Sequence, residues 1–204
     1  MNSITCAFIG LGKMGRELCA RIGSAGFPTL AYDVNPEAAK YAEDQFENVT
    51  QSDLLKAIKN SSVVFSCLPN SNLVREIVDK MLHQEGIFDN VQYWIDTTSG
   101  YPGESQRIAS DLKSQGVVFF DCAVSGGPAG AVAGTLTAMV GGDQDAFTEV
   151  ENIISSFAKN IVHLGPSGAG HAVKAVNNTL LLSLIHISEP TRPLYISYAV
   201  FCLK

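Results

Sequence analysis

A glycine-rich segment, Gly10-Leu-Gly12-Lys-Met-Gly15, constrains the fold of this chain more than any other feature. A short apolar run, Ile4–Ile9, precedes it, and a helical pattern, Lys13–Ala25, follows it. In such a strand-to-helix turn the first glycine permits the tight turn, the second lets a pyrophosphate approach, and the third lets the helix pack on the strand. The helix N-terminus then offers unpaired N–H groups to the anion. A purely structural turn is the alternative, but this context favours dinucleotide binding.

Short apolar runs alternate with helical patterns along most of the chain. This alternation predicts βαβ units, and therefore an α/β fold with a doubly wound, mostly parallel sheet and helices on both faces. The stretch Val124–Gly142 is rich in Gly and Ala, and within it we expect an edge strand. The predicted strands are Ile4–Ile9, Thr29–Asp33, Ser62–Leu68, Gln92–Asp96, Val117–Asp121, the edge strand Leu136–Val140, and Ile161–Leu164.

The composition argues against several classes of protein. The chain has 20 Asp and Glu against 14 Lys and Arg and no basic block, which argues against a nucleic-acid groove. Apolar residues make up 46% of the sequence, enough for a substantial core. No run approaches the ~18 apolar residues of a membrane span. Because no signal or transit peptide is recognisable and the five cysteines lack a C-x-x-C spacing, we expect an intracellular, reduced protein of the cytoplasm or mitochondrial matrix.

Asp33 follows the second predicted strand, where a βαβ unit selects its cofactor. A carboxylate there accepts hydrogen bonds from the ribose hydroxyls of NAD and repels the 2′-phosphate of NADP. Neither position 34 nor position 35 is an Arg that would compensate. We therefore expect NAD in preference to NADP, with a turn residue ahead of Asn35-Pro36 as the alternative. Leu68-Pro69 ends the third predicted strand, at the edge where a doubly wound sheet binds its ligand. An ordinary turn between a strand and a helix is the alternative.

Two loops with small residues follow the next two predicted strands. Ser125-Gly126-Gly127 combines a hydroxyl donor with glycines whose N–H groups can point at one anion, an arrangement suited to a carboxylate. Asp96-Thr97-Thr98-Ser99-Gly100 brings more hydroxyl groups to the same edge of the sheet. For each loop, the alternative is a turn that merely requires small residues.

Lys174 lies in a predicted helix that begins at Ser167 or Gly168 and runs at least to Leu182. His171, Lys174 and Asn178 share one helix face, beside an apolar stripe of Val173, Val176 and Leu180. Burial and the early turns of a helix both disfavour a positive charge, so both lower the lysine pKa from ~10.4 toward the range useful for proton transfer. A surface lysine with its stem on apolar residues is the alternative.

Together these motifs resemble those of the β-hydroxyacid dehydrogenase family, and most closely its branch that oxidises 3-hydroxyisobutyrate. The resemblance covers roughly residues 3–182. The segments that carry it are Gly10–Gly15, Tyr32-Asp33, Leu68-Pro69, Asp96–Ser99, Asp121–Gly127 with Gly134–Leu136 and Met139–Gly142, and Gly168–Asn178.

The resemblance implies a Rossmann domain, NAD as cofactor, no metal, and a helical domain that forms the far wall of the site and the interface of a homo-oligomer. It implies oxidation of a small carboxylate, most closely 3-hydroxyisobutyrate to methylmalonate semialdehyde. Lys174 would be the general acid/base with Asn178 assisting, and Ser125, Gly126 and Gly127 would bind the substrate carboxylate. The implied cofactor-binding residues are Gly10, Leu11, Gly12, Lys13, Met14, Gly15, Asp33, Leu68, Pro69 and Ser99.

Three other functions remain open at this stage. A 6-phosphogluconate dehydrogenase shares the Ser-Gly-Gly and Gly-His-x-x-Lys patterns but follows the first with two glutamates, where this chain has Pro128 and Ala129. A semialdehyde or glyoxylate reductase is the second alternative. The third is a module that binds NAD without catalysis.

The domain boundaries follow from the same patterns. We expect a NAD-binding Rossmann domain over residues 1–165 and the start of a truncated helical domain over 166–182, so that only the first helix of that domain is present. The segment 183–204 contains Glu189-Pro190 and Arg192-Pro193 and resembles translated sequencing adapter. We therefore expect a non-native tail from about Ser183 and an inactive fragment.

Overall fold

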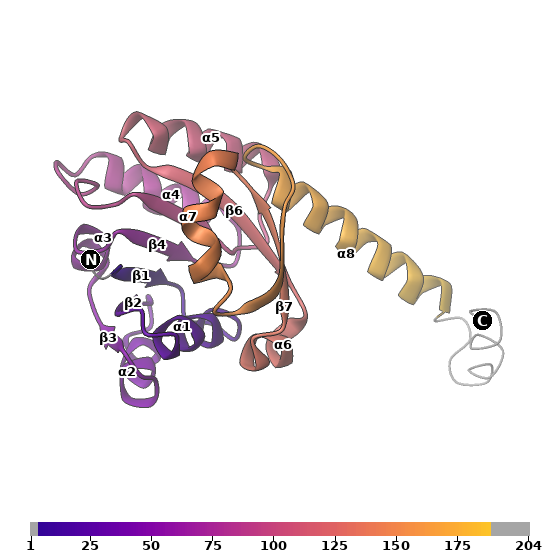
Figure 1. Cartoon of the computed structure of the whole chain (residues 1–204), viewed down its shortest axis with the longest axis horizontal. Helices are drawn as coiled ribbons and strands as arrows, with labels where there is room; N and C mark the ends of the chain where they lie inside the picture. Colours follow the sequence, from indigo (N-terminus) through magenta and orange to yellow (C-terminus); the bar gives the residue numbers. More distant parts are fainter. Residues whose placement is uncertain (1–3, 189–204) are drawn as a thin grey trace.

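A computed structural model describes residues 4–188 and shows an eight-stranded sheet covered by helices on both faces (Figure 1). The strands follow the spatial order β3-β2-β1-β4-β5-β6-β7-β8. Their bounds are β1 (Cys6–Ile9), β2 (Thr29–Tyr32), β3 (Val49–Gln51), β4 (Val63–Ser66), β5 (Tyr93–Asp96), β6 (Val118–Ser125), β7 (Leu136–Gly141) and β8 (Ala158–His163).

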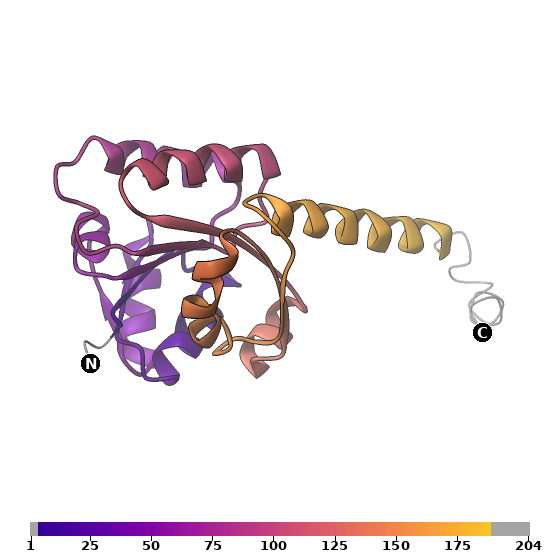
Figure 2. The same ribbon diagram turned by 45° about the horizontal axis from the view of Figure 1, so that its top comes forward.

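The helices are α1 (Gly15–Ser24), α2 (Pro36–Gln45), α3 (Leu54–Lys59), α4 (Ser71–Leu82), α5 (Pro102–Ser114), α6 (Gly127–Ala133), α7 (Gln144–Ile154) and α8 (Ala169–Ser188). They cover the sheet in two layers because side chains alternate between the two faces of each strand. Cys6 and Phe8 of β1 pack with α1, α2 and α7, while Ala7 and Ile9 pack with α3, α4 and α5 on the other face. Figure 2 shows the two layers from a second direction.

The topology confirms the predicted fold class, a doubly wound and mostly parallel sheet. Every neighbouring pair of strands is parallel except β6 and β7. The chain leaves the sheet edge at β3 and re-enters at β4 beside β1, so the order reverses between β1 and β4. In open α/β sheets a reversal of this kind opens a crevice at the carboxyl ends of the strands, where ligands bind.

The sequence prediction was wrong about one strand and missed three elements. Leu136–Val140 was expected at an edge, but β7 lies between β6 and β8, and the edge strands are β3 and β8. The strand β3 escaped notice because its sequence, Val-Thr-Gln, buries a single side chain. The helices α3 and α6 were missed because one has six residues and the other, seven residues long, consists mostly of Gly and Ala.

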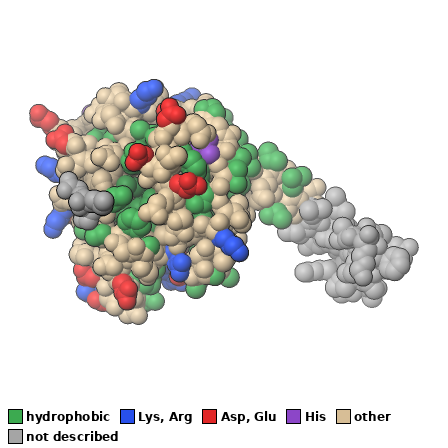
Figure 3. Space-filling view, viewed as in Figure 1, with side chains coloured by type: hydrophobic (Ala, Val, Ile, Leu, Met, Phe, Trp, Pro, Cys, Tyr) green, Lys and Arg blue, Asp and Glu red, His purple; other side chains and the backbone are tan. Residues whose placement is uncertain are grey.

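Helix α8 begins at the sheet and projects away from it (Figure 1). Apolar side chains on the projecting part are exposed, among them Val176 and Leu180, each at 59%. Figure 3 shows hydrophobic side chains along this part of the helix. Of the predicted tail, residues 183–188 continue α8 and residues 189–204 lie outside the described part of the chain. Within residues 4–188, no helix is long and apolar enough to cross a membrane.

The start of α8 is tied to the sheet by Asp121 of β6. One carboxylate oxygen accepts the backbone N–H of Gly168 (2.6 Å) and the other accepts the N–H of His171 (2.8 Å). The carboxylate is fully buried. Burial raises its pKa, and the two N–H donors partly offset that rise. One side chain thus satisfies two N–H groups at a helix start, which would otherwise be unpaired.

We predict that Asp121→Asn destabilises the fold by about 1–3 kcal/mol, because the amide supplies one acceptor oxygen and leaves a buried N–H group unpaired. Chemical denaturation measures the difference, with Asp145→Asn on the exposed first turn of α7 as the control, expected within about 0.5 kcal/mol of the wild type. An unchanged stability of Asp121→Asn would contradict this role.

Candidate cofactor and substrate site

A cavity of about 900 Å³ lies at the carboxyl ends of β1, β4 and β5, beside the reversal of strand order. Of the residues predicted to form the site, eleven line it, and four do not: Leu11, Ser125, Gly126 and Asn178. The eleven are Gly10, Gly12, Lys13, Met14, Gly15, Asp33, Leu68, Pro69, Ser99, Gly127 and Lys174. The fold therefore brings three predicted groups, the glycine-rich segment, Asp33 and Lys174, to one cavity.

The three glycines of the first loop occupy different environments. Gly10 has a φ of 97°, and a Cβ there would collide with the carbonyl oxygen of Cys67. A Cβ on Gly15 would collide with the carbonyl oxygen of Gly10, so α1 packs directly on the end of β1. A Cβ on Gly12 would meet nothing within 4 Å. The open space above Gly12 and a first turn of α1 without a side-chain cap leave room and donors for a phosphate group.

Asp33 connects the end of β2 to this loop. Its Oδ2 accepts the backbone N–H of Leu11 (2.6 Å), and its Oδ1 accepts the N–H of Asn35 (2.8 Å). A carboxylate has about four acceptor positions, so two remain for ribose hydroxyls. Asp33 is half-buried and lines the cavity. Leu11, which is buried, contributes to the site through its backbone and not through its side chain.

The loop after β5 was expected to bring hydroxyl groups to this edge of the sheet, and Thr97, Thr98 and Ser99 all line the cavity. The hydroxyl groups of Thr97 and Thr98 also join neighbouring loops. The Thr97 hydroxyl donates to the carbonyl oxygen of Ser66 (2.8 Å), and the Thr98 hydroxyl accepts the N–H of Leu68 (3.0 Å). Both residues are buried, whereas Ser99 is exposed. Among the described residues, none forms a hydrogen bond with the Ser99 hydroxyl.

Lys174 lines the cavity from α8, together with residues of the glycine-rich loop. Its side chain is half-buried, and burial lowers its pKa below the ordinary lysine value. Asn178 is exposed in the described structure, whereas Asn177 is half-buried and its Nδ2 has no hydrogen-bond partner among the described residues. Asn178 was predicted to assist Lys174 because it shares a helix face with His171 and Lys174 and because the family resemblance implies that role.

The substrate-side loop is only partly at the cavity. Val124 and Gly127 line it, whereas Ser125 is half-buried and pairs with Thr137 of β7. Gly126 has a φ of 132° and precedes α6. The assignment of the carboxylate to Ser125–Gly127 therefore remains a prediction.

Several lining residues were not anticipated from the sequence. Leu73 and Ile77 of α4 belong to an apolar pattern of helical period, and both line the cavity. Lys80 and Glu76 on the same helix add one charge of each sign. A helical period marks an apolar face but does not say whether a sheet or a ligand covers it. Tyr32, Val34 and Leu54 complete this side.

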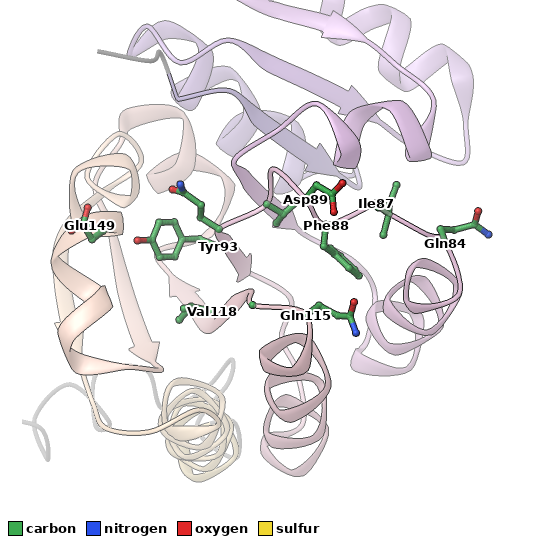
Figure 4. Close-up of a pocket in the computed structure, with 12 residues that line it drawn as sticks. Gln84, Ile87, Phe88, Asp89, Tyr93, Gln115, Val118 and Glu149 are labelled. Atoms are coloured by element: carbon green, nitrogen blue, oxygen red, sulfur yellow. The ribbon is translucent and has the colours of Figure 1, made fainter.

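A second cavity, of about 620 Å³, lies at the amino ends of β5 and β6 (Figure 4). Its lining includes Asp89 and Glu149 but no Lys or Arg, which does not suit an anionic dinucleotide. Burial, with a contribution from Glu149, raises the pKa of Tyr93 there. Among residues 4–188, no group of three or more His, Cys, Asp or Glu is placed to bind a metal ion.

Comparison with known proteins identifies the family. Residues 5–165 match the family described as the NAD binding domain of 6-phosphogluconate dehydrogenase. The chain belongs to this family. It is 34% identical over 186 residues to the mitochondrial 3-hydroxyisobutyrate dehydrogenase of Homo sapiens, with 89% of the chain and 54% of that relative covered. The chain therefore spans about half the length of the curated relatives it matches.

Two further relatives extend the comparison. The 2-(hydroxymethyl)glutarate dehydrogenase of Eubacterium barkeri is 32% identical over 180 residues, which cover 88% of the chain and 60% of that relative. A solved structure of Mycobacterium tuberculosis 3-hydroxyisobutyrate dehydrogenase with L-serine superposes with a TM-score of 0.84 at 28% identity. It covers 98% of this chain, which in turn covers 69% of that structure. The predicted resemblance to β-hydroxyacid dehydrogenases is confirmed.

The glycine environments generate a paired prediction. Gly15→Ala should destabilise the fold by about 1–3 kcal/mol, because its methyl group collides with backbone. Gly12→Ala should change stability by less than about 0.5 kcal/mol, because its methyl group meets open space. It should nevertheless weaken NAD binding at least about tenfold by filling the space for the phosphates. Thermal unfolding and cofactor titration measure the two effects, and equal destabilisation by both variants would contradict the assignment.

Proposed function

We propose that this protein binds NAD at the cavity described above and contributes the proton-transfer residue of a hydroxyacid dehydrogenase. The observation that carries the proposal is the position of Lys174, which lines the same cavity as the glycine-rich loop and Asp33. Family membership supports the cofactor site. The named activities of the human and Eubacterium barkeri relatives support a small hydroxyacid as substrate, with 3-hydroxyisobutyrate as the first candidate.

Different residues of the cofactor half would bind different parts of the dinucleotide. The backbone N–H groups around Gly12 would hold the pyrophosphate, and Asp33 would accept hydrogen bonds from the ribose hydroxyls. Lys13 would lie beside the phosphates, and Leu68 and Pro69 would lie along the cofactor at the end of β4. Ser99 would be near the nicotinamide. The preference for NAD over NADP rests on the negative charge of the Asp33 carboxylate. Lys13 and Lys80 also line the cavity, but their positive charges would attract a phosphate group and do not contribute to this preference.

On the substrate side, neutral Lys174 would take the proton from the substrate hydroxyl as the C–H hydrogen leaves as hydride and the carbon–oxygen double bond forms. Bound NAD supplies the hydride acceptor. Asn178 would hold the lysine and the reacting oxygen in line, and Ser125, Gly126 and Gly127 would bind the substrate carboxylate. The lowered pKa of Lys174 favours this role, because a larger fraction of the amine is then neutral near pH 7.

A second candidate is an NAD-binding module without catalysis. One observation favours it: the apolar side chains of α8 beyond Lys174, including Val176 and Leu180, are exposed and leave the outer side of the site open to water. Exclusion of water from the reacting atoms is part of how such sites work. On this reading the 204-residue chain binds NAD and forms no NADH.

The cofactor preference can be tested at Asp33. Calorimetric titration of the chain should give tighter binding of NAD than of NADP, because the carboxylate repels the 2′-phosphate. Asp33→Ala should weaken NAD binding and narrow the difference, and it should also loosen the loop, since the N–H of Leu11 loses its acceptor. Asp53→Ala, which removes a helix cap outside the cavity, is the matched control. Equal affinity of the unsubstituted chain for NAD and NADP would contradict the preference.

The role of Lys174 can be tested by following NADH formation from 3-hydroxyisobutyrate. The assay uses residues 1–182 joined to the part of the human relative that lies beyond the aligned region, which supplies an outer wall to the site. Lys174→Ala should lower turnover by ~10²–10⁴-fold, the usual contribution of a general acid/base, and leave NAD affinity unchanged.

The same assay separates the two candidate functions. Lys159→Ala, on exposed β8, is the control and should retain turnover. Full turnover by Lys174→Ala would exclude the lysine as the proton acceptor. NAD binding without turnover, in both the joined protein and the 204-residue chain, would favour the non-catalytic module.

A further inference from the structure

His171 lies one helical turn before Lys174 and has no part in the proposed chemistry. Its side chain is 1% exposed, at the point where α8 meets the sheet. Its backbone N–H donates to Asp121, and its Nδ1 lies 2.7 Å from the hydroxyl oxygen of Ser105 on α5. The residue therefore joins the first turn of α8 to both β6 and α5.

The imidazole ring of His171 also packs directly against Gly100. A Cβ on Gly100 would collide with Cε1 and Nδ1 of the ring and would lie 2.7 Å from the hydroxyl oxygen of Ser71. Gly100 immediately follows Ser99, so the ring touches the backbone of the loop that lines the opposite part of the cavity. Glycine at position 100 is required for this contact, because a Cβ there would displace the His171 ring or the Ser71 side chain.

The loop after β5 is also held at its C-terminal end, at Tyr101. The backbone N–H of Tyr101 donates to the hydroxyl oxygen of Ser71 at the start of α4 (2.8 Å). The Ser105 hydroxyl is 3.3 Å from the carbonyl oxygen of Tyr101, to which it donates. Ser105 thus lies between the carbonyl oxygen of Tyr101 and Nδ1 of His171. Within the described residues Nε2 has no partner.

We propose that His171 is a positioning residue that fixes Lys174 on α8 relative to Ser99 on the loop after β5. The proposal rests on the proposed function, in which Lys174 serves the substrate and Ser99 lies near the nicotinamide. Two segments contact the ring, α5 through Ser105 and the loop through Gly100. The backbone N–H of His171 binds Asp121 of β6, so the same residue also ties α8 to the sheet. Movement of the ring therefore changes the distance between the two sides of the cavity.

The experiment measures Lys174 directly in the 204-residue chain, without NAD or hydroxyacid. Competitive labelling with acetic anhydride, read by peptide mass spectrometry over a range of pH, gives the titration midpoint of each lysine. Exposed Lys159 on β8 is the internal control. In the unsubstituted chain the Lys174 midpoint should lie below that of Lys159, as its burial requires.

Four variants test the contact between the His171 ring and Gly100. Gly100→Ala should displace the ring and His171→Ala should remove it, and each should raise the Lys174 midpoint toward that of Lys159. At a pH below the Lys174 midpoint, the rate of Lys174 labelling should fall about tenfold for each pH unit by which the midpoint rises. The double variant Gly100→Ala, His171→Ala relieves the collision with the ring, leaves the contact with Ser71, and should be more stable than Gly100→Ala alone. His171→Asn places an amide nitrogen near the Nδ1 position and should keep most of the wild-type midpoint.

The outcomes decide the proposal separately from the function. If Gly100→Ala fails to fold cooperatively, His171→Ala and His171→Asn still decide it, because neither introduces a collision. A Lys174 midpoint that stays at the wild-type value in folded His171→Ala would overturn the proposal. Because labelling needs no turnover, a midpoint that shifts as expected in a chain that binds no NAD would contradict the proposed function and retain the positioning role.

Discussion

The direct packing of α1 on β1 is the contact on which the cavity depends. Gly15 has no side chain, so the first turn of α1 rests on the carbonyl oxygen of Gly10, and the N-terminus of the helix points over the end of the strand. Gly10 in turn lies against the backbone after β4. These contacts bring α1, β1 and β4 together at the reversal of strand order. Asp33 then fixes the intervening loop through the N–H of Leu11.

The opposite side of the cavity depends on buried polar groups. Asp121 holds the start of α8, and Ser66, Asp96, Thr97 and Thr98 join the loops that follow β4 and β5. A buried polar group is costly unless paired, so each bond restricts the loop that carries it. Lys174 is therefore presented by a helix whose base is rigid, although the far part of that helix projects from the domain (Figure 1).

Local patterns were sufficient for the parts of the site that the chain builds within one βαβ unit. The glycine spacing and Asp33 lie within the β1-α1-β2 unit, and both were predicted together with the fold class. The position of Thr97 and Thr98 hydroxyls depends on Ser66 and Leu68, about 30 residues earlier, and no local pattern reports it. The contact of His171 with Gly100 joins residues that are even farther apart in sequence. The choice between Asn177 and Asn178 depends on the rotation of α8, which the spacing does not fix.

We propose that the carboxyl ends of β1, β4 and β5 form a dinucleotide site facing Lys174. Backbone amide chemical shifts of the isotope-labelled chain, recorded during addition of NAD, show which residues the cofactor contacts. Shifts are expected at Gly12, Leu11, Ser99 and the first turns of α8, with Tyr93 and Glu149 at the other end of the sheet unchanged. Shifts confined to the Tyr93 cavity, or none at the glycine-rich loop, would contradict the proposed site.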